Sequence, residues 1–355
     1  MRKLGAGLAA VLMMIAGTAK AERFNFVALG DTAYNLPGDI PSYEALIRRI
    51  NTSAPAFTIH VGDTWGVLPC TEANYRWVLQ FFQKYDHPLV YTPGDNEWTD
   101  CRKPEVVSAY QAMTAGTATL EQMRLLHSMA QLDSRLARTS FADPLGSLRL
   151  LRNIFFAKSE SLGQRRMPLV RQPDVSPNKE IVENARWTKG GVVFATLSVP
   201  GSNNGFASNS EEASVEAVRR TKANVDWIKA AFEEAKRSDA KAVVLALQAG
   251  MFEDAHGDEN FGKKLVGGTE GPYAFIAQAI RDEATSFRKP VLLINGDQHA
   301  FLVDRPFLVE QGEAKPPRFG NITRLQVFGA PELKAVKVTV DTDTPWVFGF
   351  EPLHD

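Results

Sequence analysis

The sequence predicts an α/β fold in which parallel strands alternate with helices. Short apolar runs near the start of the chain alternate with segments whose apolar residues recur with helical spacing. The same alternation returns after residue 190, beyond a middle stretch that is richer in charge and poor in strand-like runs. Such alternation is typical of β-α-β units whose sheet is covered by helices. At 355 residues the chain has room for one large domain or two ordinary ones.

Each predicted strand in the N-terminal part is a short apolar run that leads to a Gly-Asp pair. These runs cover residues 24–30, 57–62 and 89–92. Residues 43–51 and 74–85 lie between them and carry apolar residues three and four positions apart, which predicts amphipathic helices. The pattern therefore predicts three parallel strands joined by two helices.

Residues 103–184 interrupt this pattern. Within them, residues 120–136 have helical spacing, whereas residues 164–179 contain three prolines and are expected to be irregular. We interpret the whole segment as a helical insertion that borders the site, and we expect substrate specificity to lie in it.

The strand–helix pattern resumes after the insertion. Strands are predicted at residues 192–198, 242–247 and 290–295, and a helix at 273–285. Residues 211–237 fit one long helix or two. The rest of the chain alternates polar and apolar residues, as antiparallel strands do. These last runs cover residues 301–309, 323–328, 335–340 and 347–350.

The first 21 residues have the plan of a secretory signal peptide. Arg2 and Lys3 precede an apolar run that ends near Ala16, and residues 19–21 read Ala-Lys-Ala, the form of a cleavage site. A membrane anchor is the alternative, but the run is shorter than the roughly 20 residues that span a bilayer. We expect a mature domain of residues 22–355, periplasmic or secreted, without a stable membrane anchor.

The charge of the chain argues against a nucleic-acid partner. Its 40 Lys and Arg residues nearly balance 41 Asp and Glu residues, which gives a formal net charge of -1. Nucleic-acid binding would require a clustered basic excess, and the sequence has no such run.

The chain has two cysteines, Cys70 and Cys101. An even number of cysteines in an exported protein is typical of a disulfide. We predict this bridge, which would connect the segment after Asp63 with the segment after Asp95. Two free buried thiols are the alternative.

Aspartates follow the predicted strands at their carboxyl ends. Gly-Asp pairs end at Asp31, Asp63 and Asp95 at equal intervals, and a fourth ends at Asp297, with His299 two residues further on. The carboxyl ends of parallel strands meet at one edge of a sheet. Each aspartate alone would be explained as a helix cap or turn residue. Four carboxylates gathered at one edge need a cation to offset their repulsion, so together they predict a metal site.

With these residues in this order, the chain resembles the calcineurin-like metallophosphoesterases over nearly its whole mature length. That family has five blocks at strand ends, D-x-H, G-D, G-N-H-[DE], a lone His and G-H-x-H, which hold two metal ions in a four-layer α-β-β-α sandwich. The resemblance implies this sandwich of two mixed sheets here. The matching positions are Asp31, Asp63, Gly94-Asp95-Asn96-Glu97, Gln248 and Gly296-Asp297-Gln298-His299.

The resemblance also implies roles for these residues. Asp63 would bridge two ions, with Asp31 and His299 on one and Asp95 and Asp297 on the other. Gln248 would stand at the position of the lone His as a further ligand. The resemblance also implies catalytic roles for Asn96, His299 and Asp63. The side-chain amide of Asn96 would orient a phosphoryl oxygen.

This chain has fewer imidazoles than the family pattern. Four histidine positions, and the asparagine of the third block, carry other residues: Ala33, Asn96, Gln248 and Asp297 for the histidines, and Asp95 for the asparagine. Imidazole suits zinc and iron, whereas carboxylate oxygens suit Mg, Ca and Mn. We therefore expect one or two divalent ions, with Mn, Mg or Ca favoured over Zn, and with Fe also compatible.

The function implied is that of an exported metal-dependent hydrolase of small phosphate esters, either monoesters or diesters. Metal-bound hydroxide would attack the phosphorus. Because Asn96 replaces the usual proton-donating histidine, the alternative is a catalytically impaired metal- or ligand-binding protein on the same fold. His60, His256 and a metal-bound water are the candidates for protonating the leaving group.

Four further residues are candidate substrate contacts. Tyr34 stands beside the first block, and Arg102 has the charge to bind a phosphate oxygen. Asn203 and Asn204 belong to a turn that follows the predicted strand 192–198. A surface ion pair for Arg102 and a plain turn for the two asparagines are the alternatives.

Overall fold

The computed structural model describes seven stretches of the chain: residues 23–66, 68–101, 104–130, 143–206, 210–252, 271–307 and 320–353. The predicted signal peptide, Arg102, His256 and the end of the predicted helix 120–136 lie outside these residues.

One sheet has the strand order β12-β11-β1-β2-β3. Strands β1, β2 and β3 are parallel, whereas β11 runs antiparallel to β1 and β12 antiparallel to β11, as the alternation in the C-terminal sequence predicts. The bounds are β1 (Phe24–Leu29), β2 (Thr58–His60), β3 (Leu89–Tyr91), β11 (Ala335–Val340) and β12 (Phe348–Leu353).

The other sheet has the order β4-β5-β6-β7-β8-β10-β9. Its bounds are β4 (Val170–Arg171), β5 (Ala185–Lys189), β6 (Val192–Thr196), β7 (Ala242–Ala246), β8 (Val291–Asn295), β9 (Leu302–Asp304) and β10 (Ile322–Gln326).

The second sheet corrects the sequence analysis at two strands. β10 is parallel to β8, although its alternating sequence predicts an antiparallel strand; alternation reports only that the two faces differ. β5 was not predicted, because its sequence, ARWTK, is largely polar. It pairs antiparallel with β6 across Gly190 and Gly191, which both have positive φ angles, 55° and 74°. A two-glycine connection is typical of a tight hairpin.

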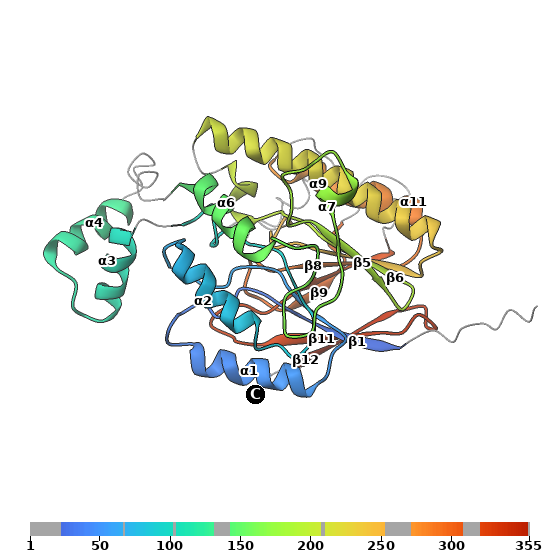
Figure 1. The fold of residues 1–355 in the computed structure, drawn as a ribbon, viewed down its shortest axis with the longest axis horizontal. Coiled ribbons are helices and arrows are strands. Elements are labelled where there is room, and N and C mark those ends of the chain that lie inside the picture. The colour runs from blue at the N-terminus through green and yellow to red at the C-terminus, as the bar shows by residue number, and fades with distance from the viewer. Residues whose placement is uncertain are drawn as a thin grey trace, which may run out of the picture.

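Helices lie on the outer faces of the two sheets (Figure 1). α9 is one unbroken helix that is capped by Ser210, whose side chain accepts a hydrogen bond from the N–H of Ala213. The bounds are α1 (Ile40–Thr52), α2 (Glu72–Phe82), α3 (Pro104–Thr114), α4 (Leu120–Ala130), α6 (Pro144–Phe155), α7 (Gln172–Val175), α8 (Gly201–Asn204), α9 (Glu211–Arg237) and α11 (Ala274–Phe287).

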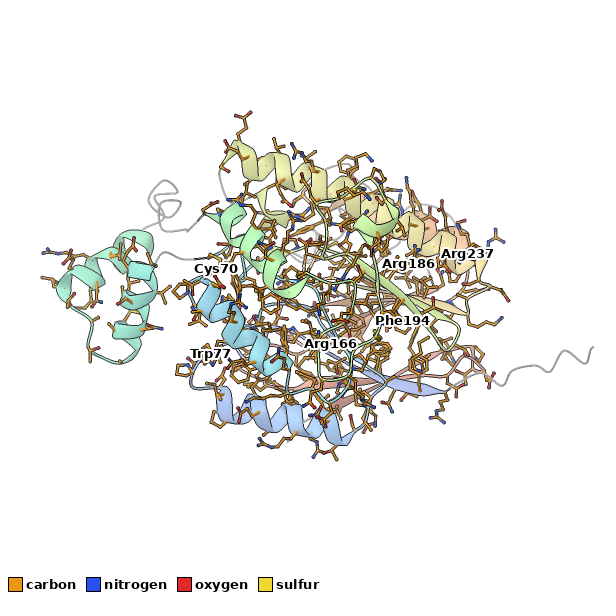
Figure 2. The ribbon with its side chains drawn as sticks, viewed as in Figure 1. Cys70, Trp77, Arg166, Arg186, Phe194 and Arg237 are labelled. Carbon is orange, nitrogen blue, oxygen red and sulfur yellow. A yellow bond between two sulfur atoms is a disulfide. The ribbon has the colours of Figure 1, made fainter. Side chains whose placement is uncertain are left out.

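The two sheets face each other across a buried aromatic and aliphatic core. Phe194 of β6 packs edge-on against Phe26 of β1 and against Phe57, with ring centroids 5.6 Å and 5.1 Å apart. Figure 2 shows Phe194 in the interior of the molecule, whereas Arg237 lies at the end of α9. Separate apolar clusters join α9 and α11 to one sheet and α1 and α2 to the other. The predicted α/β class with two mixed sheets is confirmed.

The segment predicted as an insertion has two parts. Helices α3 and α4 lie to one side, apart from the sheets (Figure 1). α6 packs on the main body, where the ring of Phe155 lies tilted against that of Tyr91 with centroids 5.2 Å apart. Residues 164–179 include β4 and α7, so the expectation of irregular structure was wrong for residues 170–175. Of the three prolines, only Pro173 lies in these elements, in the first turn of α7, where a proline is tolerated. That the insertion borders the site stays a prediction.

Cys70 and Cys101 form the predicted disulfide, with Cα atoms 5.6 Å apart. Both sulfur atoms lie near the backbone carbonyl of Asn96, at 3.6 Å and 3.9 Å. The bridge therefore encloses the loop that carries the third sequence block. Among the described helices, none has the length and apolar composition needed to cross a bilayer.

Removing the disulfide is expected to destabilise the fold. The bridge closes a loop across a sequence separation of 31 residues, and losing that restraint on the unfolded chain costs roughly 3–4 kcal/mol. Urea unfolding of the Cys70→Ser/Cys101→Ser double variant measures this loss. Wild-type protein unfolded in the presence of a reducing agent is the control and should match the variant; equal stability of oxidised wild type and variant would contradict the prediction.

Candidate functional site

The site lies at the carboxyl ends of strands from both sheets. Asp31 follows β1 and Asp297 follows β8, and the backbone N–H of Asp297 donates to both carboxylate oxygens of Asp31 at 2.9 Å and 3.1 Å. This contact joins the two sheets directly. The structure therefore brings together residues that are 266 positions apart in the sequence.

The backbone at the site is bent into the left-handed region. Four of the predicted metal ligands have φ angles of 50° to 76°, which side-chain-bearing residues rarely adopt. Such strain is typical of functional sites, where the surrounding structure imposes it. The four are Asp31, Asp63, Asp297 and His299.

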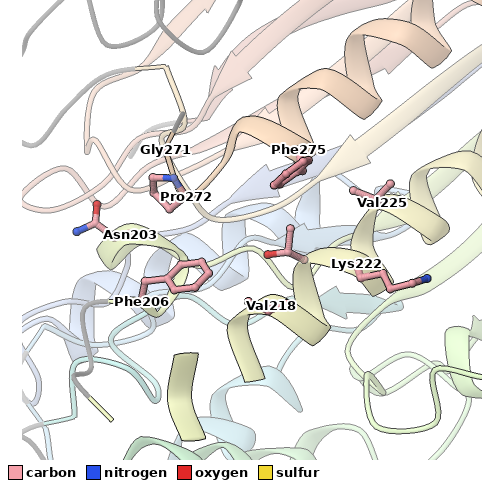
Figure 3. Close-up of a pocket in the computed structure, with 9 residues that line it drawn as sticks. Asn203, Phe206, Val218, Lys222, Val225, Gly271, Pro272 and Phe275 are labelled. Carbon is pink, nitrogen blue, oxygen red and sulfur yellow. The ribbon is translucent and has the colours of Figure 1, made fainter. Parts of the chain in front are cut away.

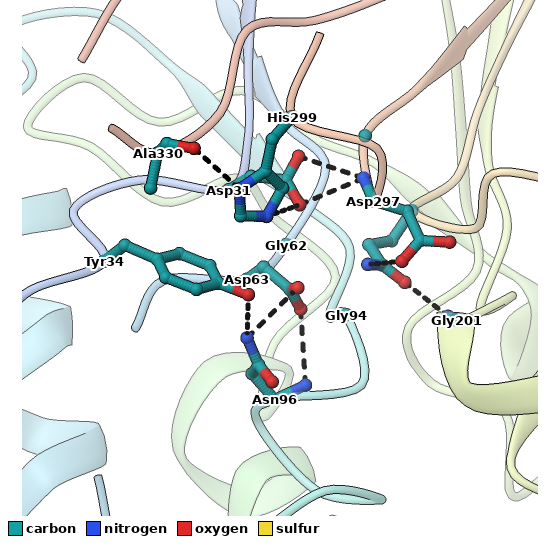
Figure 4. A network of polar contacts seen from close by, with 12 residues as sticks. Asp31, Tyr34, Gly62, Asp63, Gly94, Asn96, Gly201, Asp297, His299 and Ala330 are labelled. Carbon is teal, nitrogen blue, oxygen red and sulfur yellow. Dashed lines mark hydrogen bonds and ion pairs between the residues drawn. The ribbon is translucent and has the colours of Figure 1, made fainter. Parts of the chain in front are cut away.

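Gln248 connects two of the aspartates. Its side-chain amide nitrogen lies 3.4 Å from a carboxylate oxygen of Asp95 and 3.4 Å from one of Asp297. Its side-chain oxygen accepts the backbone N–H of Gly201, and Asp297 also accepts the N–H of Gly250 at 2.7 Å. Figure 4 shows part of this network. Gln248 thus lies among the predicted ligands.

Asn96 and Tyr34 lie beside Asp63. The side-chain amide of Asn96 donates to Asp63 at 3.2 Å and lies 2.6 Å from the Tyr34 hydroxyl (Figure 4). The ring of Tyr34 packs edge-on against His299, with centroids 4.7 Å apart. These four residues, predicted from three separate blocks and from the position beside the first block, form one group.

The tautomer of His299 follows from its partner. Nδ1 lies 2.8 Å from the carbonyl oxygen of Ala330, which only accepts hydrogen bonds, so Nδ1 carries the proton. Nε2 then faces the Asp31 carboxylate at 3.7 Å. A carbonyl partner of this kind fixes the ring orientation of metal-binding histidines.

Glycines at the strand ends allow the carboxylates to approach the backbone. A Cβ atom on Gly94 would lie 2.0 Å from an oxygen of Asp63, and one on Gly296 would lie 2.2 Å from an oxygen of Asp31. The carboxylates occupy the space that a side chain would need. This explains the glycine in two of the four Gly-Asp pairs, those of Asp95 and Asp297.

Two residues that stabilise the site, Glu97 and Ser202, were not predicted from the sequence. Glu97 is buried and accepts four hydrogen bonds, from the backbone of Asp63, Thr64 and Gly94 and from the Thr64 hydroxyl. Ser202 places its hydroxyl oxygen 2.7 Å from a carboxylate oxygen of Asp95 and of Asp100. Glu97 belongs to the third block of the family pattern. No sequence pattern near Ser202 indicates a role at the site, apart from its Gly/Asn-rich turn.

Burial and mutual repulsion raise the pKa values of these carboxyl groups. Asp31 and Asp63 are fully or almost fully buried, and loss of hydration raises their pKa values well above the ordinary range, with neighbouring carboxylates adding to the effect. The pKa of Asp95 rises to about 8, first through burial and then through the charges of Asp100 and Asp297. A cation among them would remove this penalty.

Three other predicted residues, Asn203, Asn204 and His60, lie outside this network of carboxylates. Asn204 is buried, and its side chain bonds to Thr221 and Arg220 rather than facing the carboxylates. Asn203 is exposed on the same turn. His60 is fully buried between Phe82 and Tyr91, and burial lowers its pKa to about 3. His60 is therefore a core residue and not a candidate proton donor.

The carboxylates do not converge on one point. In the described part of the chain, no three His, Cys, Asp or Glu side chains are gathered as a ready-made metal site. The side chains instead contact one another through backbone amides, Gln248 and Asn96. Their oxygen-rich chemistry and their repulsion fit a hard divalent cation, and binding would require small side-chain movements.

Comparisons with known proteins do not identify a family. No family model matches the sequence, and no curated protein matches it. A solved structure that matches is GAP50, the anchor in the inner membrane complex of Plasmodium, with a TM-score of 0.43 and 11% sequence identity over 94% of this chain and 89% of that chain. A similarity this low carries no argument about function, so the resemblance to metallophosphoesterases stays a prediction.

The pH dependence of stability tests the buried carboxyl groups. The pKa of Asp95 is about 8 in the fold against an ordinary value of 3.8, so the unfolded chain releases a proton between pH 4 and pH 8 that the fold retains. Metal-free protein should therefore be most stable near pH 4 and lose stability as the pH rises to 8. Thermal unfolding after chelation measures the slope.

Asp95→Asn should flatten this slope, whereas Asp86→Asn, at an exposed position, should retain it. Stability that rises with pH over this range in metal-free wild type would show that the carboxyl groups are not held protonated.

Proposed function

We propose that this chain is an exported, metal-dependent hydrolase of phosphoric esters. One observation carries the proposal: Asp31, Asp63 and Asp95 are buried beside Asp297 and His299 where the two sheets meet. Among the described residues, no lysine or arginine forms an ion pair with these carboxylates. A divalent cation would offset the excess negative charge of these buried carboxylates.

The donor atoms favour Mn, Mg or Ca over Zn, because four carboxylates outnumber one imidazole. Gln248 would join them only by releasing the Gly201 N–H from its side-chain oxygen. Glu97 is not counted as a ligand, since its oxygens already accept backbone and hydroxyl hydrogen bonds. Nε2 of His299 carries a free lone pair in the tautomer that its bond to Ala330 selects.

The ion would supply positive charge for the phosphoryl oxygens and would acidify water. In the overall reaction, the oxygen of water forms a bond to phosphorus, the ester P–O bond breaks, and the departing oxygen takes a proton. We assign to the Asn96 amide the orientation of a phosphoryl oxygen, for which one of its N–H groups would leave Asp63 or Tyr34. The Tyr34 hydroxyl, which accepts from Asn96, keeps its own proton available for a second hydrogen bond.

Export is supported by two features. The N-terminal sequence has the plan of a signal peptide, and the chain contains a disulfide of the kind that persists in oxidising compartments. We propose the periplasm or the extracellular space as the location.

A catalytically impaired metal-binding protein is the second candidate, and one observation favours it. The position of the family's proton-donating histidine is occupied by Asn96, whose amide is bonded to Asp63 and Tyr34. His60 cannot replace that donor, because it is buried in the aromatic core. Such a protein would bind the ion and a phosphate ester without cleaving it.

Metal loading and hydrolysis test both candidates. We expect the purified mature chain to bind Mn, Mg or Ca and to cleave 4-nitrophenyl phosphate or bis(4-nitrophenyl) phosphate. Asp63→Asn should weaken metal binding and hydrolysis by at least about 100-fold, because we assign to Asp63 the ligand position shared by both ions. Asp86→Asn is the matched control and should behave as wild type.

Metal binding without hydrolysis would support the binding protein. Chelator-resistant hydrolysis, or the absence of metal binding in wild type, would contradict the proposed metal site.

A further inference from the structure

A left-handed turn stands at one wall of the carboxylate cluster. Ser202, Asn203 and Asn204 have φ angles of 46°, 54° and 56°, and Gly205 follows at 79°. Three successive left-handed residues that carry side chains are unfavourable and persist only where contacts impose them.

Contacts on both sides hold this turn. Ser202 reaches Asp95 at 2.7 Å on the side of the cluster. On the other side, the Asn204 amide donates to the Thr221 hydroxyl at 3.0 Å, and the buried guanidinium of Arg220 donates to the Asn204 carbonyl at 2.8 Å. Asn203 lies between them, exposed, and its side chain has no hydrogen-bond partner among the described residues.

A cavity of about 730 Å³ lies beyond the turn, between α9 and α11 (Figure 3). Its wall includes three large apolar side chains that are unusually exposed: Phe206 at 37%, Val218 at 59% and Phe275 at 64%. Apart from Asn203, the polar side chains at the wall already have partners, since Thr221 accepts from Asn204 and Lys222 pairs with Asp226 at 2.8 Å. A cavity of this size and character suits an apolar group.

The cavity and the carboxylate cluster share one wall. A Cβ atom on Gly201 would lie 2.7 Å from Asp297 and 2.8 Å from Asp95, so Gly201 touches the cluster. Asn203, two residues later, lines the cavity. Two residues span at most about 7 Å, so the cluster and the cavity lie close together along this wall. The Tyr273 hydroxyl braces the same wall by donating to the Pro200 carbonyl at 3.1 Å.

We propose that this cavity binds the apolar part of the substrate, so that the ester is one with a large alkyl or aryl group. This inference rests on the proposed function. The phosphoryl group lies at the carboxylate cluster, the apolar group lies against Phe206, Val218 and Phe275, and the free amide of Asn203 bonds to the polar link between them.

A series of alkyl phosphates tests this assignment. Release of inorganic phosphate from ethyl, butyl and hexyl phosphate gives kcat/KM, and calorimetry on Mn²⁺-loaded protein gives Kd. Each added CH₂ that enters the cavity should raise kcat/KM and tighten binding by about fourfold. Chain-length dependence, rather than absolute rate, is the readout.

The double variant Val218→Asn/Phe275→Asn should lose this dependence while retaining cleavage of ethyl phosphate. The matched control is Val175→Asn/Trp346→Asn, at apolar positions that are 60% and 76% exposed elsewhere on the surface. The control should keep the full chain-length dependence. Both variants change exposed side chains, so thermal unfolding should show folded protein in each case.

The outcomes separate this inference from the proposed function. If hexyl phosphate binds more tightly than ethyl phosphate and the double variant abolishes this difference, the cavity assignment is supported. This holds even if no ester is cleaved, since only the proposed hydrolysis then fails. Cleavage with equal kcat/KM and equal Kd across the series overturns the cavity assignment and leaves hydrolysis standing. Chain-length dependence that survives in the double variant also overturns it.

Discussion

The carboxylate of Asp31 accepts the backbone N–H of Asp297, and much of the structure depends on this contact. It fixes the end of β1 against the end of β8, so the two sheets meet where their aspartates gather. Burial of these groups is unfavourable while they are charged, as the raised pKa values of Asp31, Asp63 and Asp95 indicate. The site is therefore both the connection between the sheets and the place where a cation would stabilise the fold most.

Surrounding residues hold this unfavourable arrangement in place. Glu97 binds the turns that carry Asp63 and Gly94, and the Cys70–Cys101 bridge encloses the loop of Asn96. The Trp65 indole also donates to the Asn96 carbonyl at 3.0 Å. A rigid frame of this kind keeps ligands close to their binding geometry before an ion arrives.

The sequence predicted those features of the fold and site that arise from local patterns. Apolar runs located β1, β2, β3, β6, β7 and β8, and the Gly-Asp pairs identified residues that the structure brings together. The direction of β10 could not be predicted, because pairing depends on a distant partner strand. The polar strand β5 was missed, because its place in the sheet comes from the hairpin with β6 rather than from apolar residues.

Other parts of the site depend on contacts that no local pattern encodes. The left-handed turn that contains Ser202 and Asn203 is held at Asn204 by Arg220 of α9 and by Tyr273, which precedes α11. The role of Glu97 depends on four donors from two loops. Asn204 was predicted as a substrate contact from its turn, but its side chain is enclosed by Thr221 and Arg220. The hydrogen-bond partners of an asparagine side chain cannot be predicted from the neighbouring residues in the sequence.

The central claim is that this carboxylate cluster binds a divalent cation. Anomalous diffraction from crystals soaked in Mn²⁺ tests it most directly. The account predicts a manganese peak within about 2.5 Å of oxygens from Asp63 and from at least one of Asp31, Asp95 and Asp297. Well-ordered crystals with no peak among these residues, at Mn²⁺ concentrations that fill other sites on the protein, would contradict it.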